Sequence, residues 1–177
     1  MKLSPVLPVV LLLVLAPFPA GAQPAEKWSE FKSAACRCSA LLPGAPKEQK
    51  QTYSTEVGPV DATLFVLEAE EGKVAYLIGY NDYPKDKVKG FDKQKMLDGA
   101  KKGAVNNVQG KLLTEKKIEL GGFPGLEIEV EAGTSRVFVR IVVAEERLYQ
   151  ALVVMPAASA RPADVRKFLD SIKLAKK

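Results

Sequence analysis

Cys36 and Cys38 are the only cysteines in this sequence, and they form its one constellation that could carry chemistry. Residues i and i+2 of a β-strand share a face, so the two sulfurs can be neighbours. Three interpretations follow: two small buried thiols, a disulfide made in an oxidising compartment, or a redox pair or two-thiolate Cu(I) site. The disulfide meets an obstacle, because the Cα atoms in an extended strand lie roughly 6.5–7 Å apart, near the upper limit for such a bond.

A lysine-rich segment over residues 85–102 is the second candidate site. Its seven lysines outnumber its three aspartates and give it a charge of +4. It is interpreted either as a solvated helix face with its leading loop, or as a docking patch for an acidic protein, an anionic polymer or lipid headgroups. The lysines are Lys85, Lys87, Lys89, Lys93, Lys95, Lys101 and Lys102.

An acidic stripe follows later in the chain, where Glu127, Glu129 and Glu131 alternate with apolar residues. The period of two predicts a strand with its carboxylates on the solvent-exposed side. A calcium site there would need more converging oxygen ligands than one strand provides.

The complete absence of histidine excludes several kinds of catalysis. Ser-His-Asp and Cys-His nucleophile systems need an imidazole to take a proton near neutral pH. Sites that bind zinc, copper or non-haem iron through histidine are excluded as well. The sequence also has no Walker loop, no dinucleotide fingerprint and no hydrolase motif. We therefore expect no enzyme activity, no cofactor and no metal.

The amino terminus has the three parts of a secretory signal peptide. Lys2 supplies a positive charge, residues 6–15 are apolar apart from one proline, and Ala20-Gly21-Ala22 offers a cleavage site. We expect cleavage near Ala22–Gln23, a periplasmic or extracellular location, and no transmembrane segment in the mature chain. That chain of 155 residues carries +4, which is 26 basic residues less Lys2, minus 21 acidic ones. This surplus does not indicate nucleic acid.

The pattern of the rest predicts one α+β domain in which a single antiparallel β-sheet is flanked by two helices. Strands with short hairpin turns between them must pair antiparallel, because a parallel crossover needs more chain. Apolar spacing of three and four predicts helices over 92–108 and from about 159 onwards. A polar lead-in with Trp28 and Phe31 is expected to form a helical turn or an edge strand that packs on the core. The expected strands are 36–42, 48–57, 60–68, 74–80, 111–120, 126–131, 136–143 and 148–155.

The order of these features resembles the PsbP-like sandwich fold. The resemblance rests on the aromatic lead-in, residues 41–46 (Leu-Leu-Pro-Gly-Ala-Pro), a mid-chain helix, the turn at 121–125 and the final Phe-Leu-Asp-Ser-Ile run at 168–172. That fold is shared by the PsbP subunit of photosystem II, by Mog-type Ran-binding import factors and by exported bacterial proteins of unknown role. Cys38 stands where exported relatives usually have an aromatic residue.

The resemblance implies an accessory or binding protein, because no catalytic motif is common to members of that fold. We expect four parts: a signal peptide (1–22), a lead-in (23–35), the PsbP-like domain (36–174) and a basic tail (175–177). The expected function is an exported, non-catalytic binding module whose partner is an unknown protein or an anionic envelope component. The alternative is a small thiol redox or Cu(I)-handling protein that uses Cys36 and Cys38.

Overall fold

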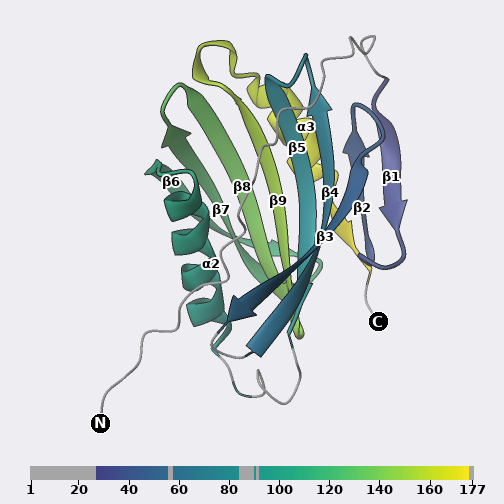
Figure 1. The fold of residues 1–177 in the computed structure, drawn as a ribbon, viewed down its shortest axis with the longest axis vertical. Coiled ribbons are helices and arrows are strands. Elements are labelled where there is room, and N and C mark those ends of the chain that lie inside the picture. The colour runs from purple at the N-terminus through teal and green to yellow at the C-terminus, as the bar shows by residue number, and fades with distance from the viewer. Residues whose placement is uncertain (1–26, 56–57, 84–89, 91, 176–177) are drawn as a thin grey trace.

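The fold was examined in a computed structural model, which describes residues 27–55, 58–83, 90 and 92–175. It contains a seven-stranded antiparallel sheet in the order β3-β4-β5-β9-β8-β7-β6 and a three-stranded sheet in the order β1-β2-β10. Two α-helices pack on these sheets (Figure 1). The elements are β1 (Ser29–Ser33), β2 (Cys38–Leu42), β3 (Lys47–Thr55), β4 (Gly58–Ala69), β5 (Val74–Asp82), α2 (Lys93–Asn107), β6 (Lys111–Leu120), β7 (Phe123–Ala132), β8 (Ser135–Ala144), β9 (Arg147–Pro156), α3 (Pro162–Asp170) and β10 (Lys173–Leu174).

The expected α+β class is confirmed, and the hairpin turns fall where the sequence placed them. Residues 70–73 and 145–146 connect strands through backbone with positive φ at Glu70, Glu71, Gly72 and Glu145. The turn expected over 121–125 is tighter, because only Gly121 and Gly122 form it, both with positive φ. The sequence predicted a single sheet, and the second sheet was not recognised because its strands are short and its members β2 and β10 are far apart in the chain.

Helix α2 covers one face of the large sheet, against β7 and β8 (Figure 1). Asp92 caps it, because its carboxylate accepts a hydrogen bond of 2.8 Å from the Gln94 backbone amide. Leu97 and Ala100 are buried beneath the helix, and Gly103 allows it to approach closely. They pack on a cluster that includes Leu126 and other aliphatic residues of β7, β8 and β9.

Helix α3 and the three-stranded sheet cover the opposite face. Val165, Phe168 and Leu169 are buried on one side of α3, as the sequence predicted. The lead-in forms the strand β1 instead of a helical turn. Its aromatic residues pack on the core as expected, with Trp28 edge-on to Tyr76 at 5.7 Å and Phe31 against Phe65 at 4.8 Å between ring centroids.

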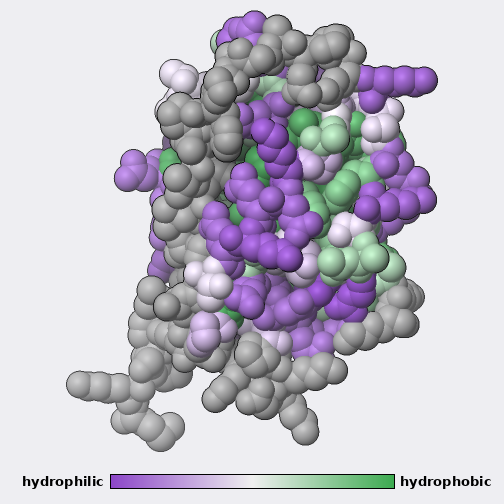
Figure 2. All heavy atoms as spheres, turned by 45° about the vertical axis from the view of Figure 1, so that its right-hand side comes forward, coloured by the Kyte–Doolittle hydropathy of each residue, from purple (hydrophilic) through white to green (hydrophobic). Residues whose placement is uncertain are grey.

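The surface of the described residues is predominantly polar on the face drawn in Figure 2. Hydrophilic side chains there surround and interrupt the hydrophobic ones. A broad apolar face of the kind that marks large protein interfaces is not seen in this view. Within the described ranges, no helix has the length and apolarity needed to cross a membrane.

Candidate functional site

The two cysteines are joined by a disulfide bond in the turn between β1 and β2. The strand was expected to begin at Cys36, and this was wrong: β2 begins at Cys38. The preceding residues form a turn in which the Arg37 amide donates to the Ala34 carbonyl at 3.2 Å. Arg37 adopts a φ of 57°, so the chain curls between the cysteines and their Cα atoms lie 5.1 Å apart. This curl removes the geometric obstacle of an extended strand.

Both cysteines are buried in the core beneath the three-stranded sheet. Cys36 has no exposed surface and Cys38 is 6% exposed. Thiol–disulfide exchange requires an attacking thiolate to reach a sulfur atom, and burial prevents that approach. Neither sulfur is a thiolate in this state, so a Cu(I) site would first require reduction of the bond.

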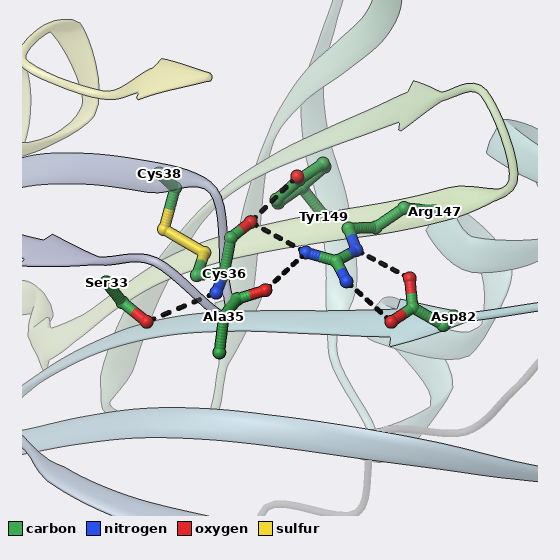
Figure 3. Close-up of a disulfide and its surroundings, with 7 residues drawn as sticks. All are labelled: Ser33, Ala35, Cys36, Cys38, Asp82, Arg147 and Tyr149. Atoms are coloured by element: carbon green, nitrogen blue, oxygen red, sulfur yellow. Dashed lines mark hydrogen bonds and ion pairs between the residues drawn. A yellow bond between two sulfur atoms is a disulfide. The ribbon is translucent and has the colours of Figure 1, made fainter. Parts of the chain in front are cut away.

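Arg147, at the start of β9, holds the backbone of this turn (Figure 3). Its Nη1 donates to the carbonyl oxygens of Ala35 at 2.7 Å and Cys36 at 2.8 Å. The Tyr149 hydroxyl donates a second hydrogen bond of 2.8 Å to the Cys36 carbonyl. On its other side, the guanidinium binds both carboxylate oxygens of Asp82, at 2.6 and 2.5 Å.

The charge of Arg147 is nearly enclosed, since the residue is 7% exposed. Burial lowers the pKa of the guanidinium, but the Asp82 carboxylate outweighs this and raises the pKa above its ordinary value. The guanidinium also lies 4.0 Å from the ring centroid of Tyr80, a cation–π contact. Arg147 thus connects three features: the disulfide turn, the end of β5, and the aromatic ring of Tyr80.

A groove of about 740 Å³ opens next to this cluster, across the ends of β3, β4 and β5. Residues that pair across neighbouring antiparallel strands share one face of a sheet. Lys50 pairs with Thr63 and Thr63 with Tyr80, while Thr52 pairs with Asp61. Together with Asp82, these residues line the groove. It has the volume of a typical small-molecule site.

The groove contains two hydroxyl groups on residues that are nine-tenths buried. Thr63 is 8% exposed and Tyr80 is 9% exposed. Both residues line the groove, and within the part of the chain that the structure describes neither hydroxyl has a hydrogen-bond partner. Beside them, Asp61 accepts a hydrogen bond of 2.7 Å from the Thr52 hydroxyl. The floor of the groove therefore offers donors and acceptors to a ligand.

The predicted lysine patch is only partly within the described residues. Lys85, Lys87 and Lys89 lie outside them. Lys93, Lys95 and Lys102 are exposed on α2. Lys101 instead binds Glu115 of β6 at 3.0 Å, and this hydrogen bond raises its pKa. Lys101 is thus used to attach α2 to the sheet.

The acidic stripe on β7 is only partly solvent-exposed: Glu131 is exposed as expected, whereas Glu127 and Glu129 are partly buried. It lies on the face opposite α2, among arginines. The Glu127 side chain is 12% exposed and binds Arg140 at 2.6 Å and Arg166 at 2.5 Å. Burial raises the pKa of Glu127, but hydrogen bonds from these two arginines outweigh it and lower the pKa below its usual range. Glu129 and Glu131 are paired with Arg136.

Sequence reasoning missed the groove residues and Arg147. No motif marks them, because they come from β3, β4, β5 and β9 and meet only through strand pairing. Among the described residues, no three histidine, cysteine, aspartate or glutamate side chains are placed to hold a metal ion. We take the groove as the candidate ligand site of the described residues.

Comparison with known proteins shows the fold. No family of known sequences matches the chain, and no curated protein matches it. Among solved structures, it is similar to cyanobacterial PsbP (CyanoP) from Synechocystis, with a TM-score of 0.55 and 12% identity over 87% of this chain and 95% of that one. A protein from Bacteroides thetaiotaomicron matches with a TM-score of 0.46 and 12% identity, over 84% of this chain and 48% of that one. The chain thus has a PsbP-like fold, as the order of its sequence features indicated.

Proposed function

We propose that this protein is an exported, non-catalytic accessory protein that binds its partner or ligand through the groove across β3, β4 and β5. The observation that carries the proposal is the pair of hydroxyl groups on Thr63 and Tyr80, two residues that line the groove. Hydroxyl groups without a partner among the described residues can donate and accept hydrogen bonds at a concave surface, which favours a binding role.

The neighbouring disulfide supports a location outside the cytoplasm. Such bonds persist in oxidising compartments and are rare where glutathione and thioredoxin keep thiols reduced. The signal-peptide pattern at residues 1–22 points the same way. In this proposal the disulfide has a structural role: it fixes the turn that Arg147 holds at one end of the groove region.

Export is tested by expressing the full chain in a bacterium and separating periplasm, medium and cytoplasm. We expect the protein outside the cytoplasm, with a mass that corresponds to cleavage near Ala22–Gln23. Full-length protein confined to the cytoplasm would contradict the proposal.

Binding is tested with a photo-crosslinking amino acid placed at Thr52, which lines the groove. The matched control places the same group at Thr114, an exposed residue of β6 at the opposite edge of the sheet. We expect a discrete cross-linked product in intact cells from position 52 and not from position 114. Equal labelling from both positions, or none from either, would refute a working role for the groove.

A further inference from the structure

We infer that the ligand of the groove is an uncharged saccharide chain; this inference rests on the proposed function and specifies its ligand. The reasoning starts from the side chains on the floor of the groove, which come from two cross-strand rows. One row contains Lys50, Thr63 and Tyr80, and the other contains Thr52 and Asp61.

The chemistry of these rows disfavours an apolar ligand and an anionic one. An apolar ligand would cover the hydroxyls of Thr63 and Tyr80 without hydrogen-bonding them, which is unfavourable for buried polar groups. An anion would face the carboxylate of Asp61, while the charge of Asp82 is already paired with Arg147. The ammonium of Lys50 does not offset the Asp61 charge, since it is exposed and already paired with Glu48 at 3.3 Å.

A simple cation can satisfy the hydrogen-bond acceptors of the groove but not its donors. The carboxylates would attract it, but an ammonium or guanidinium group has no acceptor for hydroxyl donors. A neutral polyol has both functions in every hydroxyl group. It can donate to the carboxylates of Asp61 and Asp82 and exchange hydrogen bonds with the hydroxyls of Thr63 and Tyr80.

The shape of the groove also fits a chain of sugar units. It runs across three adjacent strands, from Lys50 on β3 to Asp82 on β5. Adjacent strands lie about 4.8 Å apart, so the groove spans roughly two such spacings. The Tyr80 ring is 9% exposed and lies 4.0 Å from the Arg147 guanidinium, so the ring is held in place and its hydroxyl is the group offered to a ligand.

The experiment uses three neutral hexasaccharides as probes: maltohexaose, cellohexaose and N-acetylchitohexaose. Each is titrated into the ¹⁵N-labelled mature protein to about 10 mM, which detects dissociation constants in the millimolar range. We expect at least one probe to shift the amide signals of Thr52, Thr63 and Tyr80 in a saturable manner. The absence of shifts with all three probes, or shifts confined to residues outside the groove, would overturn the inference.

Two conservative variants then locate the contact. Thr63→Val and Tyr80→Phe each remove one hydroxyl, and we expect each to weaken binding about 3–10-fold, as for a neutral hydrogen bond. Thr114→Val removes a hydroxyl at the far edge of the sheet and should leave the affinity unchanged. Unchanged affinity in both groove variants, with their amide spectra otherwise intact, would refute the assignment.

The two proposals fail separately. If position 52 cross-links to an envelope protein while no hexasaccharide binds, the binding role stands and the saccharide assignment is wrong. If neither occurs, both are wrong.

Discussion

Replacement of Arg147 by methionine tests the central contact of the candidate site. The guanidinium makes four hydrogen bonds: two to the Asp82 carboxylate and one each to the carbonyls of Ala35 and Cys36. Methionine keeps much of the aliphatic packing and removes all four. We expect the disulfide turn to lose its attachment to β9 and the protein to lose stability.

The magnitude follows from how exposed each partner is. The Asp82 side chain is 55% exposed, so water replaces the arginine and this ion pair is discounted to about 0.2–1 kcal/mol. The carbonyl bonds contribute about 0.5–1.5 kcal/mol each, but the Cys36 carbonyl keeps its bond from Tyr149. The contact with the Tyr80 ring adds about 1 kcal/mol. Removal of the desolvation cost of the charge offsets part of these losses, so we expect a net loss of about 2–3 kcal/mol.

Urea unfolding followed by the fluorescence of Trp28, the only tryptophan, measures this loss. Thermal unfolding should show a decrease of about 4–12 °C in the melting temperature for a domain of this size. Arg37→Met is the matched control, because it removes the same type of charge from the turn that Arg147 contacts, and Arg37 has no ion pair within the described residues. A loss below about 0.5 kcal/mol in Arg147→Met, or one equal to the control, would refute the reasoning.

Four further predictions concern the disulfide and contacts elsewhere in the fold. Replacement of both Cys36 and Cys38 by alanine should reduce the free energy of unfolding by about 1–2 kcal/mol, the chain-entropy value for so short a loop; no loss in urea titrations would contradict this. The native disulfide should also resist reductant that reaches exposed disulfides, because both sulfurs are buried. Glu127 has a lowered pKa, so the stability that its carboxylate contributes is complete above the unfolded-state pKa of about 4.3 and is lost as the pH falls through the lower folded-state pKa. Melting curves from pH 7 to 3 should show the stability difference between the native protein and Glu127→Gln shrinking. A constant difference would be inconsistent with this. Lys101→Gln should cost about 0.5–1 kcal/mol by releasing α2 from β6, whereas Lys95→Gln, exposed on the same helix, should cost nothing measurable.

The local elements were predictable because each depends on residues that are near in the chain. The helix over 93–107 followed from apolar spacing, and the strand 111–120 was predicted with its observed limits. The hairpins fixed antiparallel pairing, since their turns are too short for a crossover. The acidic stripe on β7 shows the limit of such reasoning. Period two placed Glu127 on one face of the strand, but could not indicate that α3 and Arg140 would cover that face.

By itself the sequence determined the α+β class, the order of the elements, the packing of Trp28 and Phe31, and the lack of imidazole chemistry. Only the tertiary structure decided the surroundings of the cysteines, because the Arg147 guanidinium that binds the Cys36 carbonyl lies 111 positions away in the chain. The groove likewise depends on the tertiary structure. Lys50, Thr63 and Tyr80 become neighbours through the registers of β3, β4 and β5, and a register is a property of paired strands that no single segment contains.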